Sequence, residues 1–325
     1  MILEMTNVSK IYKIKKVGKF RREKQKIYAI DSLDFSIDTS EIVGYLGVNG
    51  AGKSTTIKLV TGILVPTEGS IKVFNKDPYK YRKIIAKKTG VVFGQRSQLI
   101  WDLPAIDTLN LYSKIYEIPQ NEYRKVLGNI VCSMNLEEIL NIPVRHLSLG
   151  QRMCCEIACS LIHSPQLLLL DEPTIGLDII NKEKVRNFVR EQNEIHGTTI
   201  MLTTHDIGDV EKLCKRVVII NEGRKIYDDS LKELKLLYGT TSKILIDFFT
   251  PISNEILEKF ALLGINACRA DGDEKSICIE YNPSKHDQSH IIRQAVSNFN
   301  EIKNISVKEN GLEDILSDMF KHSNT

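Results

Sequence analysis

The sequence lacks any apolar run long enough to cross a bilayer, and it carries little net charge. A net charge of +3 over 325 residues gives no argument for nucleic acid as a partner. No hydrophobic stretch approaches the ~18 residues of a membrane-spanning helix, and no signal-peptide core is expected near residue 1. The chain is therefore not expected to form a channel itself, which leaves docking on one open.

Cysteine is sparse and has no framework spacing. The seven cysteines are an odd number, as expected for free thiols in a reducing cytoplasm. Cys155 and Cys159 share a helix face, which either a metal site or the packing of small side chains would explain; we favour packing. His286 and His290 have the same spacing in a polar segment, where a solvated face is the simpler interpretation.

The chain is long enough for two domains, and its pattern changes near residue 240. Before that point, strand-like and helix-like segments alternate, which predicts an α/β domain with a largely parallel sheet. Strands are expected over residues 41–46, 167–170 and 199–202, and helices over 55–61, 152–163 and 181–196. We therefore predict a first domain over residues 1–240 and an accessory domain over 241–325.

The accessory domain has the pattern of a small α+β module. Its expected elements are a strand at 243–249, a helix at 254–263, a strand at 276–281, a helix at 290–299 and a strand at 302–308. This β-α-β-(β)-α-β order suggests a ferredoxin-like arrangement. A last helix over 313–320 is expected to pack on it.

Residues 10–26 form a basic segment, with nine Lys or Arg residues against the single Glu23. We expect a solvated loop there. Contact with anionic lipid headgroups or with an acidic partner is the alternative.

The most informative segment is Gly47-Val48-Asn49-Gly50-Ala51-Gly52-Lys53-Ser54, which fits the G-x-x-x-x-G-K-[ST] pattern of a phosphate-binding loop. Glycines let the backbone turn tightly beside an anion, and amides at the following helix N-terminus point at the phosphates. Lys53 is expected to reach the β- and γ-phosphates, and the Ser54 hydroxyl to ligate Mg²⁺. The expected phosphate-binding residues are Gly47, Asn49, Gly50, Gly52, Lys53, Ser54 and Thr55. The pattern predicts that the chain binds a nucleoside triphosphate.

Two acids follow the apolar strand 167–170. A buried strand there would place Asp171 and Glu172 at the carboxyl edge of the sheet, where the phosphates are expected. Asp171 is then expected to hold Mg²⁺, and Glu172 to orient or deprotonate the attacking water.

A second phosphate-binding surface is predicted at Leu147-Ser148-Leu149-Gly150-Gln151, just before a helix. The Ser148 hydroxyl and the Gly150 amide would lie at the N-terminus of that helix. Alone this string is a weak signal. Between a phosphate-binding loop and a strand ending in Asp-Glu, it distinguishes one family from other proteins with such a loop.

With these three elements in this order, residues 1–240 resemble the nucleotide-binding subunit of an ATP-binding-cassette (ABC) transporter. The resemblance implies an ABC-type ATPase domain with a helical subdomain, using ATP and Mg²⁺. It implies roles in ATP binding or hydrolysis for Gln95 (Mg²⁺ and γ-phosphate sensing), Ser148, Gly150 and Gln151 (signature), Asp178 (D-loop), His205 (switch histidine) and Tyr12 (stacking on adenine). Leu149 departs from the family's usual Gly, so we expect altered packing there without loss of function.

The resemblance also implies partners. Two such subunits close head to tail around two ATP molecules, and we favour identical copies over a pair of different chains. A separate integral-membrane permease would hold the pair at the cytoplasmic face of the cell membrane. The basic segment, Gly94-Gln95-Arg96 and the accessory domain resemble bacterial exporters of drugs, sodium or lipids. An importer subunit, or a soluble ABC ATPase acting on ribosomes or DNA, is the alternative, and no nucleic acid is expected.

The only tryptophan, Trp101, falls in a region that in this family receives the permease. Two interpretations stay open. Trp101 is either an anchor for that partner or part of the core of the helical subdomain.

Overall fold

The computed structural model describes residues 1–17, 22–94, 97–238, 242–262, 265–270, 273–281, 287–299, 302–309 and 312–322. The chain forms two compact units, Met1–Ser230 and Leu231–Thr325. The division therefore precedes helix α8 (Leu231–Tyr238), whereas the sequence placed it at residue 240. The difference arises because α8 packs against α11 (Leu312–His322), a contact made within the second unit.

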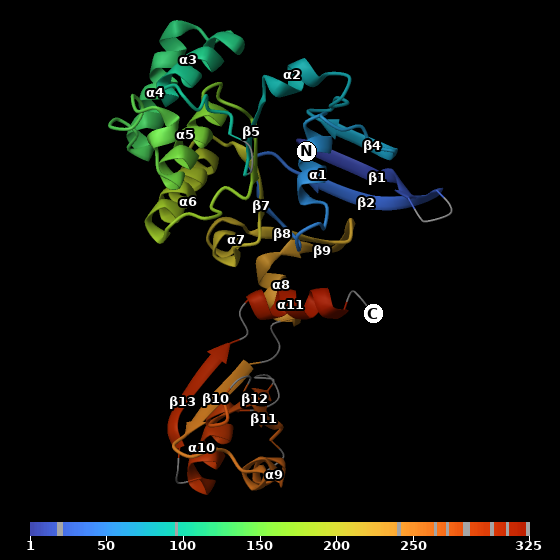
Figure 1. Cartoon of the computed structure of the whole chain (residues 1–325), viewed down its shortest axis with the longest axis vertical. Helices are drawn as coiled ribbons and strands as arrows, with labels where there is room; N and C mark the ends of the chain where they lie inside the picture. The colour runs from blue at the N-terminus through green and yellow to red at the C-terminus, as the bar shows by residue number, and fades with distance from the viewer. Residues whose placement is uncertain are drawn as a thin grey trace. The chain divides into compact units, whose positions relative to one another are not determined.

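A six-stranded sheet in the order β5-β6-β7-β3-β8-β9 forms the centre of the first unit (Figure 1). Its strands are β3 (Ile42–Leu46), β5 (Thr89–Phe93), β6 (Leu167–Asp171), β7 (Thr199–Thr204), β8 (Arg216–Asn221) and β9 (Arg224–Ser230). All neighbours pair in parallel except β8 and β9. Every residue of β6 and β7 is buried, so the predicted strands at these two apolar runs are confirmed.

A second, antiparallel sheet has the order β2-β1-β4, with β1 at Leu3–Val17, β2 at Arg22–Ile37 and β4 at Glu68–Val73. One apolar core lies between the two sheets. In it, the ring centroids of Phe35 and Tyr45 lie 5.4 Å apart. The strands β1 and β2 continue into the basic segment, with Lys13 opposite Lys26. The expectation of a loop is therefore wrong for the described part of this segment, where the β-branched and aromatic pairs Ile11–Tyr28 and Tyr12–Ile27 favour a paired strand.

Helices cover the first unit at α1 (Lys53–Val60), α2 (Arg82–Ala86), α3 (Ala105–Ile115), α4 (Gln120–Met134), η1 (Val144–His146), α5 (Leu149–Leu161), α6 (Ile179–Glu194) and α7 (Ile207–Leu213). The helices α3, α4 and α5 gather on one side as a helical subdomain (Figure 1). Within the described residues, no helix is both long and apolar enough to span a bilayer.

The helices α5 and α6 begin earlier than the sequence predicted, and local chemistry explains the starts of α1, α5 and α6. Gly52 turns into α1 with φ 111°. Ser148 and Gln151 form a capping box that starts α5, and Asp178 caps α6 by accepting from the amide of Asn181.

The second unit contains β10 (Ser242–Phe248), α9 (Asn254–Leu262), β11 (Ala267–Arg269), β12 (Ser276–Tyr281), α10 (Gln288–Asn298) and β13 (Ile302–Glu309). The element order is therefore β-α-β-β-α-β, as the sequence suggested. Its strands form one antiparallel sheet in the order β11-β12-β10-β13. One face of this sheet packs on a core that includes Ile244, Phe260 and Ile291.

Candidate nucleotide-binding site

The loop between β3 and α1 has a backbone that its glycines make possible. At Gly52 a Cβ would lie 2.6 Å from the carbonyl oxygen of Ala29, and φ is +111°. At Gly47 a Cβ would lie 2.6 Å from the carbonyl oxygen of Ile220. Both distances are far below van der Waals contact, so side chains are excluded and the loop leaves room for an anion beside its amides.

Lys53 places its ammonium inside this loop. The side chain is 7% exposed, and Nζ donates to the carbonyl oxygen of Gly47 at 2.7 Å. The same Nζ lies 3.6 Å from Oε1 of Glu172. A buried cation is thus held beside the anion-accepting loop by groups that a phosphate could replace.

Asp171 joins two neighbouring strands to the start of α1. Its Oδ2 accepts from the Ser54 hydroxyl at 2.9 Å, and its Oδ1 accepts from the Thr203 hydroxyl at 2.6 Å. The hydroxyl and carboxylate oxygens of Ser54 and Asp171 are the ligand type that Mg²⁺ prefers, so these two residues fit the expected metal ion. Sequence reasoning missed Thr203, although the strand pairing sets it directly opposite Asp171.

Glu172 and His205 lie next to each other at the same edge of the sheet. His205 Nδ1 is hydrogen-bonded to Oε2 of Glu172. The backbone of Glu172 has φ 56°, a left-handed conformation that is uncommon for a residue other than glycine and that often marks functional sites. Glu172 is 16% exposed and His205 57%, so both are accessible from the pocket.

These residues line one pocket of about 690 Å³. Nine predicted site residues line it: Asn49, Gly50, Gly52, Lys53, Ser54, Thr55, Asp171, Glu172 and His205. The sequence did not anticipate that Ala29, Phe93 and Ile175 also line it. Gln95, predicted to sense Mg²⁺ and the γ-phosphate, lies outside the described residues.

The signature residues and Asp178 form a separate surface. Ser148 caps α5 by accepting from the amide of Gln151, and Gln151 accepts from the amide of Ser148 in return. A Cβ at Gly150 would lie 2.5 Å from the Asn181 side chain, which is itself held by Asp178. The α5 and α6 N-termini therefore meet here, and the described lining of the pocket includes none of these residues.

Leu149, which departs from the family pattern, lies in the same surface. It is 41% exposed, and a Cβ at Gly176 would lie 2.9 Å from its Cδ2 atom. The leucine side chain therefore covers Gly176, in the turn before Asp178.

Tyr12 and Trp101 lie outside the pocket. Tyr12 is paired with Ile27 and is 39% exposed, with the Lys10 ammonium 5.5 Å from its ring centroid. Trp101 is 52% exposed, and the guanidinium of Arg152 lies 5.7 Å from its ring. This exposure shows that the alternative placing Trp101 in the core of the helical subdomain is wrong.

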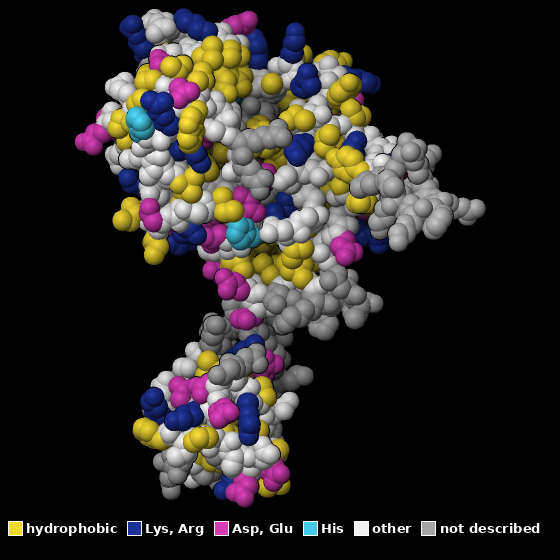
Figure 2. Space-filling model, in the orientation of Figure 1, with side chains coloured by type: hydrophobic (Ala, Val, Ile, Leu, Met, Phe, Trp, Pro, Cys, Tyr) yellow, Lys and Arg dark blue, Asp and Glu magenta, His cyan; other side chains and the backbone are white. Residues whose placement is uncertain are grey.

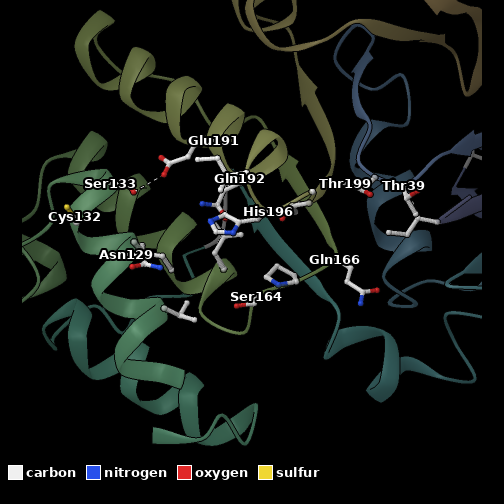
Figure 3. Close-up of a pocket in the computed structure, with 18 residues that line it drawn as sticks. Thr39, Asn129, Cys132, Ser133, Ser164, Gln166, Glu191, Gln192, His196 and Thr199 are labelled. Atoms are coloured by element: carbon white, nitrogen blue, oxygen red, sulfur yellow. Dashed lines mark hydrogen bonds between the residues drawn. The ribbon is translucent and has the colours of Figure 1, made fainter. Parts of the chain in front are cut away.

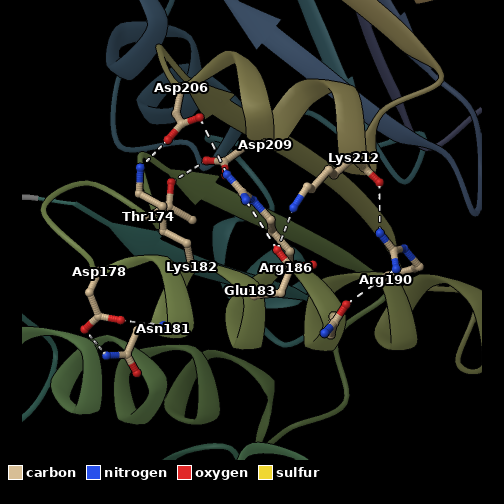
Figure 4. A network of polar contacts seen from close by, with 11 residues as sticks. Thr174, Asp178, Asn181, Lys182, Glu183, Arg186, Arg190, Asp206, Asp209 and Lys212 are labelled. Carbon is tan, nitrogen blue, oxygen red and sulfur yellow. Dashed lines mark hydrogen bonds and ion pairs between the residues drawn. The ribbon is translucent and has the colours of Figure 1, made fainter.

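A charged network supports the segment that carries His205, and the sequence did not reveal it (Figure 4). Asp209 is fully buried, and Arg186 of α6 donates to its Oδ1 from Nε at 2.7 Å and from Nη2 at 2.6 Å. The hydroxyl of Thr174, two residues after Glu172, donates to the other oxygen of Asp209. Asp206 forms an ion pair with the Lys182 ammonium, and its Oδ1 atom lies 3.6 Å from Nη2 of Arg186. The burial of Asp206 opposes its ionisation, but the Lys182 hydrogen bond and both cations outweigh it, so the pKa of Asp206 is lowered.

A second hollow of about 720 Å³ lies between α4, α6 and the N-terminal ends of β6 and β7 (Figure 3). Ser133 donates to Glu191 across it, and His196 and Gln192 border it. No predicted site residue lines it, within the part of the chain that the structure describes.

Comparison with known proteins agrees with this geometry. The model of the ABC transporter family matches residues 30–175. The chain is similar to the ABC transporter ATP-binding protein NatA of Bacillus subtilis, with 31% identity over 216 residues, covering 66% of this chain and 87% of that protein. Similarity extends to the Nod factor export ATP-binding protein I of Sinorhizobium fredii, with 35% identity over 226 residues, covering 70% of this chain and 62% of that protein.

Solved structures give the same result. The structure of an ATP-binding subunit of an ABC transporter aligns with a TM-score of 0.63 and 26% identity, covering 74% of this chain and 94% of that chain. A dimeric ATP-binding cassette in a post-hydrolysis state with ADP and Pi aligns with a TM-score of 0.60 and 29% identity. The alignment covers 70% of this chain and 98% of that chain. The chain therefore belongs to the ABC transporter family, as an ATP-binding subunit that hydrolyses ATP.

Proposed function

We propose that two copies of this chain close head to tail around two ATP molecules and drive export through a separate membrane permease. The observation that carries the proposal is the separation of the two surfaces that are predicted to bind phosphate. One consists of the loop from Gly47 to Thr55, and the other of Ser148, Gly150 and Gln151 at the N-terminus of α5. One ATP can contact both surfaces if they come from different copies.

In this proposal the loop amides and Lys53 hold the phosphates, and Glu172 accepts a proton from the water that attacks the γ-phosphorus. His205 holds the Glu172 carboxylate in place, and Asp178 contributes to the interface between the copies. Mg²⁺, held by Ser54 and Asp171 with Gln95, would supply positive charge that offsets the charge of the phosphates. Tyr12 is proposed to stack on adenine when ATP is bound.

The substitution Glu172→Gln tests the assignment of the base. Because the amide cannot accept a proton, we expect turnover to fall about 10²–10⁴-fold while ATP binding is kept. The matched control is Glu194→Gln, which changes an exposed carboxylate on the same unit. ATP turnover and equilibrium binding of the two variants are compared with those of the unaltered chain, and near-normal turnover of Glu172→Gln would exclude Glu172 as the base.

Support for a permease partner comes from an apolar surface and from the names of relatives. Hydrophobic side chains gather over the helical subdomain (Figure 2). The exposed ones there include Ile100, Trp101, Leu103, Leu111 and Ile115. Three of the similar proteins are named for export, one of Nod factor and two of fluoroquinolones. We therefore propose that this surface receives a permease at the cytoplasmic face of the cell membrane, and that no nucleic acid is involved.

Purification from gently solubilised membranes tests the permease directly. We expect a polytopic membrane protein in stoichiometric amount, and we expect Trp101→Ala to weaken its recovery without changing the stability of the chain. Recovery with ribosomes or DNA would instead support a soluble ABC ATPase, and recovery with a substrate-binding protein as well as a permease would support an importer.

A further inference from the structure

Two cysteines of the second unit face each other across neighbouring strands. Cys268 in β11 and Cys278 in β12 are direct partners in an antiparallel pair. Direct partners point to the same face, with Cα atoms about 4.5–5.5 Å apart, and a disulfide requires about 4.4–6.8 Å. The Sγ atom of Cys268 lies 3.5 Å from the carbonyl oxygen of Cys278, so this thiol is directed at the partner strand.

The face that carries both thiols is open to solvent. On β12 the neighbouring side chains of Ile277 and Ile279 point the other way, into the core. Cys268 is exposed and Cys278 is half-buried.

The other cysteines lack this combination. Cys154, Cys155, Cys159 and Cys214 are buried, and burial raises the pKa of the Cys155 thiol to about 12. Cys132 is exposed but is the only cysteine in α4. Accessibility and a facing thiol therefore coincide at Cys268 and Cys278.

We propose that Cys268 and Cys278 are a dithiol that a low-molecular-weight disulfide oxidises reversibly to a cross-strand disulfide. One thiolate attacks the disulfide, forming a mixed disulfide and releasing one small thiol. The second thiolate then attacks the protein sulfur of that mixed disulfide, closing the Cys268–Cys278 bond and releasing the second small thiol. The two cysteines lose two electrons and two protons, and the small disulfide is reduced to two thiols. An exposed disulfide of this kind follows the redox state of its surroundings.

The test uses the folded, full-length chain incubated with oxidised glutathione. Free thiols are then alkylated, and the chain is digested with trypsin and analysed by mass spectrometry. Cleavage after Arg269 and Lys275 places the two cysteines on separate peptides, so a disulfide joins them into one species. We expect the peptide 260–269 to be linked to the peptide 276–285, and dithiothreitol to reverse the link.

Two variants serve as controls. In Cys278→Ser, Cys268 should accumulate as the glutathione mixed disulfide because the second step is lost. In Cys132→Ser, the cross-link should form as in the unaltered chain. The proposal is overturned if glutathione adds separately to Cys268 and Cys278 without linking them, if both stay reduced while Cys132 reacts, or if either forms its bond with another cysteine. Circular dichroism before and after oxidation verifies that the chain stays folded.

Discussion

Removing the Arg186 guanidinium should destabilise the first unit strongly. Arg186→Met keeps an unbranched apolar stem in place of the arginine methylenes but leaves Asp209 without its cation. Asp209 is fully buried, and both short contacts from Arg186 go to its Oδ1 atom. The change therefore leaves a buried carboxylate uncompensated inside the network that supports the His205 segment.

The structure allows the size of this effect to be worked out. Breaking a buried ion pair by removing one partner costs about 3–5 kcal/mol. For a unit of the size of Met1–Ser230, each kcal/mol lowers the melting temperature by about 2–4 °C, which gives a decrease of roughly 6–20 °C. Adding Asp209→Asn should recover part of the loss, because it removes the unpaired charge and keeps groups that bond to Thr174 and Thr204.

Urea unfolding of the full chain measures this free energy. The control is Arg190→Met, one turn along α6, because Arg190 bonds to neutral groups, the Asn187 amide oxygen and the carbonyl of Lys212. That variant should lose no more than about 1 kcal/mol. Equal losses in Arg186→Met and Arg190→Met would refute the reasoning, and so would a double variant that is less stable than Arg186→Met.

Two further predictions concern the phosphate-binding loop and a buried histidine. Gly52→Ala should abolish ATP binding because its Cβ would collide with the Ala29 carbonyl, while Gly128→Ala, which meets open space on α4, should leave binding intact; nucleotide titration distinguishes them. Burial lowers the pKa of His163 from 6.5 to about 4. Below pH 6.5 the unfolded chain therefore binds a proton that the folded chain does not, so the free energy of unfolding should fall by up to about 3 kcal/mol between pH 6.5 and pH 4. His163→Phe should remove this part of the pH dependence in unfolding curves, and an unchanged pH slope would contradict the assignment.

The parts of the site that are contiguous in the sequence were predictable from it. The residues from Gly47 to Thr55 are contiguous, and their glycines, Lys53 and Ser54 stand at the spacing of a phosphate-binding loop, so the sequence alone predicts it. Glu172 and His205 follow buried strands, and strand pairing brings them together. The left-handed backbone of Glu172, with φ 56°, could not be predicted, because a glutamate after a strand gives no sign of such a conformation.

The remaining features depend on contacts between distant residues. Arg186 and Asp209 belong to different helices, and each alone has the pattern of an ordinary surface charge. The division at residue 230 depends on the packing of α8 against α11, which lies far along the chain. The early start of α5 is different, because Ser148 and Gln151 have the spacing of a capping box and that signal could have been used.

The most direct test of the account is ATP-dependent dimerisation of the Glu172→Gln variant, measured by sedimentation velocity with and without Mg²⁺ and ATP. We expect a monomer without ATP and a dimer with it. Adding Ser148→Asp should abolish the dimer but not ATP binding, because Asp still caps α5 while its charge repels the phosphates of ATP held by the other copy. A Glu172→Gln chain that binds ATP and stays monomeric, or a dimer that is indifferent to Ser148→Asp, would contradict the head-to-tail arrangement.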